Sequence, residues 1–409
     1  MAETQHHVLI VGAGITGLLL AQALKQVRTP FVVISRSRDL IIHFHAERHP
    51  WGVSLQWALP LIAECLPKEQ FSRIHETAVD ASYVPEDPGR FPTFHGKTGA
   101  HIKDIPLVYM YRVSRHKFRA LCHEGIDVQY GKTLVGLKYP QAGSVVALFG
   151  DGSEITGTLV VGADGVRSSV RECIFDEVDR SLGLARTAPY IVISLHACYG
   201  DAEKALFVRR NHPVLFHGIH PDGFWLWLSV QDVPSDDPAT WSFQLLITCK
   251  PRVGLDPSVE PITLARVQQM AESFGEPFRS AWRWVPPGTS PSSNYMSYWE
   301  PIPWNHREGR VTLAGDAAHA MTVQRGQGMN NGIADAVSLA KGLQRVVEGE
   351  SSMEDTIEEY QREMIERGAA EVRLSKQQTE MVHDWNLALK SPLLNKEACF
   401  PQERTSHRL

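Results

Sequence analysis

The chain has 409 residues and a formal charge of −5, from 41 Lys plus Arg against 46 Asp plus Glu. It is 43% hydrophobic and 21% charged, which is typical of globular proteins and excludes collagen-like, disordered and coiled-coil classes. A nucleic-acid backbone requires a clustered basic surface, and the sequence has none, so we expect no nucleic-acid partner. The length corresponds to two or three domains at about 150 residues each.

The six cysteines form no C-x-x-C pair and there is no N-x-[ST] sequon, so we expect a reduced, cytoplasmic protein without a zinc site. Residues 8–24 carry no charge and resemble a membrane segment. Three glycines interrupt them, no positive residues precede them, and they are shorter than a membrane span. We therefore predict a buried strand followed by a helix, and no transmembrane segment.

The first half of the chain alternates strands and helices, which indicates a doubly wound sheet. In chain order, we predict a strand at 7–11, a helix at 18–24, a strand at 31–35, a helix at 52–70, an irregular excursion at 80–106, a helix at 114–123 and a hairpin of 144–149 with 154–161.

After residue 185 the sequence changes to strands and turns. We predict an alternating strand at 190–197, a hairpin of 214–219 with 224–230, a strand at 311–314, a periodic helix at 329–347 and a charged helix at 353–385. This predicts a discontinuous first domain of 1–184 and 301–390, an inserted antiparallel-sheet domain of 185–300 and a C-terminal tail of 391–409.

A glycine-rich turn follows the first predicted strand and opens the first predicted helix. In such a turn Gly12 permits the tight bend, Gly14 lets a pyrophosphate approach the backbone, and Gly17 lets helix and strand pack closely. An acidic residue is expected at the end of the second strand, but Ser35 stands there, followed by Arg36. The turn alone does not separate NAD, NADP and FAD.

Two further turns of this kind follow predicted buried strands. One presents Asp164 and the other presents Asp316, before a G-Q-G-M-N run that opens the helix at 329–347. Asp316 is placed to bond the hydroxyls of a polyol chain, and the positive end of the helix is placed to stabilise negative charge on a docked ring such as a reduced flavin. We expect no metal at Asp316 and His319, because no further ligand lies nearby.

In this order and spacing, the three turns resemble those of the single-chain, class A FAD-dependent aromatic hydroxylases, the salicylate hydroxylase-like group, and its fungal secondary-metabolism branch most closely. The resemblance extends over nearly the whole chain and implies an α/β fold, with a Rossmann-like FAD-binding domain and an inserted substrate sheet. It implies reduction of FAD by NADH or NADPH, reaction with O2 to a flavin C4a-hydroperoxide, and hydroxylation or epoxidation of an aromatic or indole-like molecule. It leaves the oligomeric state open.

The resemblance also implies, position by position, which residues bind FAD. These are Gly12, Gly14 and Gly17 at the pyrophosphate, Ser35 and Arg36 in the place of the ribose carboxylate, Arg48 and Gly52 in an early flavin loop, Arg115 as an FAD-contacting arginine, Asp164 in a motif shared by FAD and NAD(P)H, and Asp316, Gly328 and Met329 at the ribityl chain and flavin ring.

Two positions depart from the family pattern: Ser35 replaces an acidic residue, and Val323 replaces a proline close to the site of oxygen chemistry. They motivate an alternative on the same fold, a cyclase or isomerase that transfers no oxygen. A flavin-dependent halogenase ranks lower, because the W-x-W runs starting at Trp282 and Trp225 match its signature incompletely. A non-enzymatic flavoprotein scaffold is the third reading.

Oxygen transfer to a phenol-like ring requires little acid–base help beyond deprotonation of the substrate. Strand alternation places Tyr190 and His196 on one face of the inserted sheet, and His217 is expected on the paired strand. These three residues are the catalytic candidates. For each, the alternative is an ordinary sheet residue.

Overall fold

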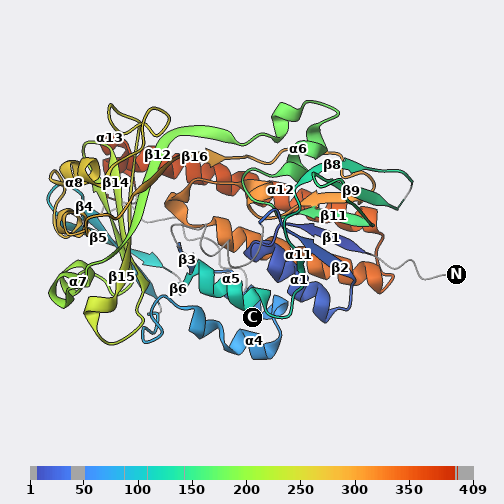
Figure 1. Cartoon of the computed structure of the whole chain (residues 1–409), viewed down its shortest axis with the longest axis horizontal. Coiled ribbons are helices and arrows are strands. Elements are labelled where there is room, and N and C mark those ends of the chain that lie inside the picture. The colour runs from blue at the N-terminus through green and yellow to red at the C-terminus, as the bar shows by residue number, and fades with distance from the viewer. Residues whose placement is uncertain are drawn as a thin grey trace. The chain divides into compact units, whose positions relative to one another are not determined.

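The structure is a computed structural model that describes residues 7–37, 51–86, 88–107, 109–141, 143–391 and 394 (Figure 1). The chain divides into two compact units. The first comprises Met1–Ala78, Tyr111–Ala188 and Ser297–Lys376, and the second comprises Val79–Met110, Pro189–Met296 and Gln377–Leu409. The second unit thus contains residues 79–110 and 377–390 in addition to the inserted block, whereas the domain boundaries predicted from the sequence placed these residues in the first domain.

The first unit is built on a five-stranded parallel sheet in the order β17-β11-β1-β2-β7. Its strands are Val311–Leu313, Leu159–Gly162, Val8–Val11, Phe31–Ile34 and Val128–Gln129. Strands β1 and β11 are buried along their whole length, as central strands covered on both faces must be. This confirms the predicted α/β fold with a Rossmann-like sheet.

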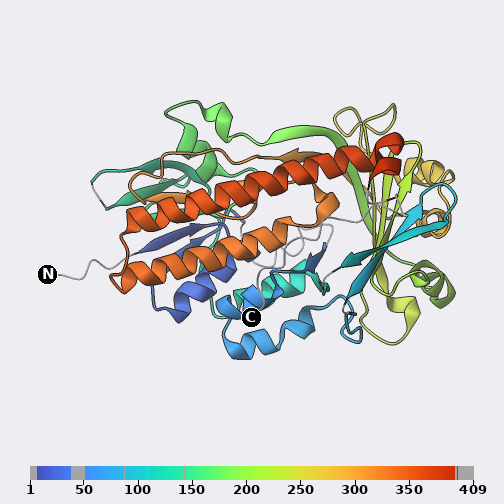
Figure 2. The ribbon, with the colours of Figure 1, turned by 180° about the vertical axis from the view of Figure 1, so that it is seen from behind.

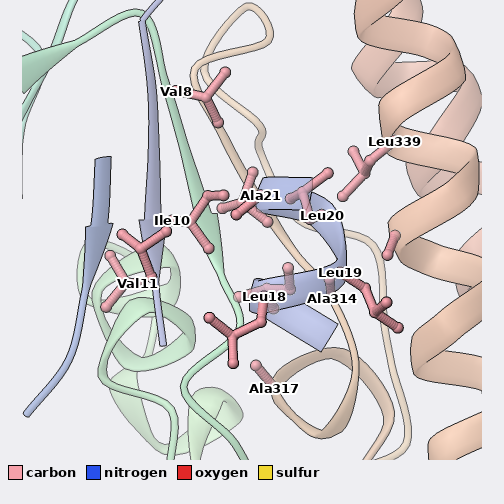
Figure 3. Close-up of a cluster of buried hydrophobic side chains, with 14 of the residues drawn as sticks. Val8, Ile10, Val11, Leu18, Leu19, Leu20, Ala21, Ala314, Ala317 and Leu339 are labelled. Carbon is pink, nitrogen blue, oxygen red and sulfur yellow. The ribbon is translucent and has the colours of Figure 1, made fainter. Parts of the chain in front are cut away.

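Helices α1 (Ile15–Gln26) and α11 (Gly328–Val347) form the core of this unit together with the sheet. Figure 3 shows Ile10 of β1, Leu20 of α1 and Leu339 of α11 among the buried side chains of this one cluster. The uncharged stretch at 8–24 is therefore β1 and α1, as predicted. None of the described helices is both long and apolar enough to cross a membrane.

Helix α12 (Met353–Val382) runs beside α11 (Figure 2). The two helices approach closely at Gly342, where a Cβ atom would lie 2.7 Å from Cγ2 of Thr356. The long periodic helix and the charged helix after it are thus confirmed, although α12 ends three residues earlier than predicted.

Smaller elements complete the first unit. They are β3 (Gly52–Leu55) paired with β6 (Tyr111–Ser114), α3 (Leu59–Cys65), α4 (Lys68–Ser72), η1 (Ile74–Thr77), α5 (Arg115–His123), the sheet β10-β9-β8 (Glu154–Gly157, Val145–Phe149, Leu134–Lys138), α6 (Ser169–Phe175), η2 (Arg180–Gly183), α10 (Asp316–His319) and η4 (Val323–Arg325). The predicted helix at 52–70 was wrong for its first residues, because pairing with β6 extends them as a strand.

The second unit contains a seven-stranded sheet in the order β16-β12-β15-β14-β13-β4-β5. Its strands are Ser292–Tyr298, Arg186–Cys198, Ser242–Cys249, Phe224–Asp232, Leu215–His220, Gly89–His95 and His101–Leu107. The short helices are α7 (Ala202–Arg209), α8 (Leu264–Ala271), α9 (Phe278–Arg283), α13 (Trp385–Lys390) and η3 (Pro238–Thr240). Phe216 of β13 contacts Phe278 of α9 with ring centroids 5.4 Å apart, so one sheet face packs on this helix.

One expectation about this unit was wrong and another was confirmed. The excursion at 80–106 is not irregular, because it supplies β4 and β5; Pro106 is tolerated since β5 is an edge strand, where a missing amide leaves no ladder bond unmade. Strand β13 pairs antiparallel with β14, which confirms the predicted hairpin of 214–219 with 224–230, and β14 and β15 separate it from β12.

Candidate functional site

The three glycine-rich turns leave the same edge of the parallel sheet. Strands β1, β11 and β17 are neighbours, and their last residues are in register: Val11 pairs with Gly162, and Gly162 pairs with Leu313. The carboxyl ends of parallel strands are where open α/β sheets bind their ligands. The structure therefore joins three motifs, separated by about 150 residues each in the sequence, in one site.

The three glycines of the first turn have different surroundings. Gly12 has a φ of 124°, and a Cβ atom there would lie 2.1 Å from the carbonyl oxygen of Ala163. A Cβ atom on Gly17 would lie 2.1 Å from the carbonyl oxygen of Gly12, whereas one on Gly14 would meet nothing within 4 Å. Gly12 and Gly17 thus permit close packing, and Gly14 leaves free space where α1 begins without a capping side chain or an acidic residue.

The carboxylate of the second turn serves its own helix. Asp164 accepts hydrogen bonds from the Ser168 hydroxyl at 2.5 Å and from the Ser169 amide at 2.7 Å, at the start of α6. Burial raises the pKa of Asp164, although these hydrogen bonds oppose that effect. Its side chain therefore fixes the backbone of the turn, and any contact with a ligand at this turn falls mainly to backbone groups.

The third turn exposes its carboxylate. Asp316 is exposed, and its Oδ1 lies 3.5 Å from the position that a Cβ atom on Gly328 would occupy. The turn that carries Asp316 and the first residue of α11 are therefore adjacent. Met329 follows, half-buried against the core of the unit. The third turn and the start of α11 thus bring together three of the predicted FAD-binding residues: Asp316, Gly328 and Met329. Helix α11 begins without a capping side chain.

Four of the remaining predicted residues lie at other positions of the first unit. Ser35 is buried, and its hydroxyl accepts a hydrogen bond from the Ser37 amide at 3.3 Å, while Arg36 is exposed. Gly52 lacks the Cβ that would lie 2.7 Å from Nη2 of the buried Arg112. Arg115 is the first residue of α5 and is half-buried. Arg48 lies outside the described residues.

Sequence reasoning missed the side chains that hold the turns in place. Arg119 donates to the carbonyl of Ala13 at 2.8 Å. Arg171, fully buried, donates to the carbonyls of Val166 at 2.6 Å and Ala317 at 2.8 Å, so it links the second turn to the third. The available signal was their position: each is a charged residue on an otherwise buried helix face.

The second unit presents an aromatic cluster on the sheet face opposite α9. The cluster consists of Phe91, His217, Trp225 and Trp227, on β4, β13 and β14, with ring centroids 4.2 to 5.9 Å apart. The Trp225 indole donates to Nδ1 of His217 at 2.8 Å, and Nε2 of His217 lies 2.7 Å from the Thr93 hydroxyl. Burial lowers the pKa of His217 to about 3, so its ring is neutral with both nitrogens in use.

The other two catalytic candidates lie on β12. Tyr190 is buried and contacts the ring of His383 at 4.6 Å; burial raises the pKa of its hydroxyl. His196 is half-buried opposite Gln244 of β15. His217 is separated from both by two intervening strands, so the three candidates form no single cluster.

No metal centre is evident in the part of the chain that the structure describes, since it contains no group of three or more His, Cys, Asp or Glu residues able to hold an ion. Trp282, one of the two partial halogenase matches, is buried in the core that contains α9. That match is accounted for by packing.

The family model described as "FAD binding domain" matches residues 5–188 and 295–375. The chain is 39% identical to the FAD-dependent monooxygenase phnB of Penicillium herquei, over 97% of this chain and 96% of that protein. Its fold is similar to that of HpxO of Klebsiella pneumoniae, which was solved with FAD and uric acid. The TM-score is 0.72 at 20% identity, and the match covers 95% of this chain and 91% of HpxO. A salicylate hydroxylase substrate complex gives a TM-score of 0.70 at 18% identity, with 97% and 92% covered.

Proposed function

The chain belongs to the FAD binding domain family and is an FAD-dependent monooxygenase, and from this we propose that it uses NAD(P)H and O2 to hydroxylate or epoxidise an aromatic or indole-like molecule in secondary metabolism. The observation that carries the proposal is the convergence of three glycine-rich turns on one sheet edge, with open space at Gly14.

The residues present fit FAD. A helix start with free amides beside Gly14 suits the pyrophosphate, because unpaired amides and the helix dipole favour an anion. Asp316 suits the ribityl hydroxyls, and the start of α11 at Gly328 and Met329 suits the flavin ring. When bound, FAD supplies the electron transfer from NAD(P)H and the reaction with O2. We also propose that Ser35 and Arg36 lie beside the ribose of FAD, and that Gly52 and Arg115 contact FAD as the family resemblance implies.

The aromatic cluster of the second unit supports a flat ring as substrate. Its half-buried rings, Phe91 and Trp227, keep some apolar surface on which a planar molecule gains dispersion and quadrupole contacts, and the buried His217 and Trp225 support them. Of the proteins with a similar fold, HpxO was solved with uric acid, and salicylate hydroxylase was solved as a substrate complex. We propose that the cluster forms part of the surface that binds the substrate ring.

Of the three catalytic candidates, we propose different parts for each. His217 holds the cluster in place, because a base needs a free ring nitrogen and both nitrogens of His217 are in use. Tyr190 keeps its proton at neutral pH, so it suits hydrogen-bond donation to a substrate oxygen. His196 remains the candidate that accepts a proton.

A visible spectrum of the purified protein, followed by NADH and NADPH oxidation across a panel of phenols and indoles, tests the proposal. We expect a yellow protein whose oxidation of the nicotinamide is accelerated by a substrate and yields a product containing one atom of ¹⁸O from ¹⁸O2. A product that forms without O2 and NAD(P)H would instead establish the cyclase or isomerase alternative. A colourless protein with no affinity for FAD would contradict both.

A further inference from the structure

A buried carboxylate lies beneath the third turn. Gly315 begins this turn with a φ of 63°, in the left-handed region that glycine tolerates. Its amide is not bonded to another backbone group. It donates instead to Oδ2 of Asp335, in α11, at 2.7 Å. The backbone bonds around it involve the Ala314 amide and the Gly315 carbonyl, so the partner of the Gly315 amide itself is the Asp335 side chain.

Asp335 is fully buried and ionised. Its Oδ2 also lies 2.7 Å from Nε2 of the buried His319, and its Oδ1 accepts from Nη2 of Arg367 at 2.8 Å. Burial alone would raise the pKa of Asp335, but His319 and Arg367 lower it to about 2. The two carboxylate oxygens are thus divided between the turn on one side and a cation on the other.

Arg367 connects this carboxylate to α12. Its Nη1 donates to Oδ1 of Asn331 at 2.8 Å, one turn before Asp335 in α11. The next residue, Gly368, leaves room for His319, since a Cβ atom there would lie 3.0 Å from Cβ of His319. The turn, α11 and α12 are therefore locked together by a single network of side chains.

We propose that Asp335 is a positioning residue for FAD: by holding the Gly315 amide, it fixes the direction of the neighbouring Asp316 carboxylate and its spacing from Gly328. The inference rests on FAD as cofactor and on the proposed contact of Asp316 with the ribityl chain. Asp335 itself is buried, so its effect on the cofactor is transmitted through the turn.

Asp335→Asn tests this role, because an amide of the same size cannot accept hydrogen bonds on both sides of the group. The measurement is the FAD dissociation constant, from flavin fluorescence during titration of apoprotein, together with the melting temperature of the apoprotein. We expect the dissociation constant to rise at least tenfold, equivalent to about 1.4 kcal/mol. An unchanged dissociation constant in folded Asp335→Asn protein would overturn the proposal.

Asp80→Asn is the matched control. Asp80 is also buried and pairs with an arginine, Arg209, but within the second unit. We expect this variant to lower the melting temperature and to change the FAD dissociation constant less than threefold. An equal loss of FAD affinity in both variants would mean that any buried charge defect has this effect, and would also overturn the proposal.

If Asp335→Asn does not yield folded protein, the FAD dissociation constant of Arg367→Lys tests the proposal instead. Lysine keeps one positive charge but replaces the planar fork, whose two terminal nitrogens reach Asn331 and Asp335 separately, by a single nitrogen. We expect a threefold or larger rise in the FAD dissociation constant, and an unchanged value contradicts the proposal. Both readouts are binding and stability, so a protein that binds FAD without oxygenating a substrate would refute the proposed function and leave this inference standing.

Discussion

The sheet edge with the glycine-rich turns and the sheet face with the aromatic cluster are built in opposite ways. At the edge, backbone approaches backbone, as at Gly12 and Gly17, and no substituted residue fits. On the face, strands at ordinary spacing bring side chains such as Phe91 and His217 together. The first arrangement suits a ligand of constant shape, such as the dinucleotide proposed for it, and the second suits a proposed ring substrate whose structure can vary.

The largest expected effect comes from Gly17→Ala. The added methyl group would lie 2.1 Å from the Gly12 carbonyl oxygen, so α1 must move away from the turn. Overpacking of a core costs about 1 to 3 kcal/mol, and a clash with backbone lies at the upper end. We expect the free energy of unfolding of the apoprotein, measured in urea, to fall by about 3 kcal/mol.

Gly14→Ala is the matched variant that sharpens the comparison. A methyl group there meets nothing in the protein within 4 Å, so we expect the unfolding free energy of the apoprotein to change by less than about 1 kcal/mol. The FAD dissociation constant should nevertheless rise at least tenfold, because the methyl group would occupy the space proposed for the pyrophosphate. Unchanged FAD affinity would remove Gly14 from the site.

Lowering the pH should destabilise the sheet that carries the aromatic cluster before it destabilises the parallel sheet that carries the glycine-rich turns. His217 and His383 have pKa values of about 3 and 4 in the folded chain, below the ordinary 6.5, because burial disfavours their charged forms. The unfolded chain therefore binds more protons below pH 6.5, and stability falls as pH decreases, by up to about 2 kcal/mol per histidine at pH 5. Asp335, with a pKa of about 2, stays ionised there.

Hydrogen exchange at pH 7 and pH 5, corrected for intrinsic rates, measures this difference. We expect the opening free energy of amides in β13 and β14 to decrease on acidification, and that of amides in β1 and β11 to change less. Equal losses in the two sheets would show that the histidines do not control the stability of the second unit.

Phe91→Leu should have a smaller effect. It keeps an apolar side chain but removes the ring contacts with His217 and Trp227, at 4.2 and 5.7 Å between centroids. Such pairs contribute about 0.5 to 1.5 kcal/mol each. We expect a loss of about 1 kcal/mol of unfolding free energy and a higher KM for an aromatic substrate. Val84→Ala, at a site 80% exposed, is the control and should change both quantities little.

The smallest expected effect concerns Ser35→Glu. A carboxylate at the end of β2 would offer charge-assisted hydrogen bonds to the ribose hydroxyls, which the present serine, bonded to the Ser37 amide, does not supply. We expect the FAD dissociation constant to fall roughly threefold, equivalent to about 0.7 kcal/mol. Weaker FAD binding by Ser35→Glu would indicate that the ribose does not lie beside this residue.

The same difference in construction explains what could be predicted. The turns were readable because Gly12, Asp164 and Asp316 lie one, two and three residues after the end of a strand, and local order fixes their place at the sheet edge. Asp335 was missed, because its function depends on contacts with Gly315 and Arg367 across three elements. The pairing of β13 with β14 was predicted correctly because a short turn joins them, whereas the separation of His217 from β12 depends on a strand order that alternation along one strand does not reveal.

The strand order of the first unit also sets a sequence of events during synthesis. Strand β1 is made first, but its neighbour β11 begins at residue 159, and β17, which completes that side of the sheet, begins at residue 311. At translation rates of 5 to 20 residues per second, β17 is made roughly 15 to 60 s after β1. The antiparallel strands β12 to β15 meanwhile pair among near neighbours. The sheet edge proposed to bind FAD is therefore assembled after most of the second sheet exists, so we expect FAD to assist only the last stage of folding.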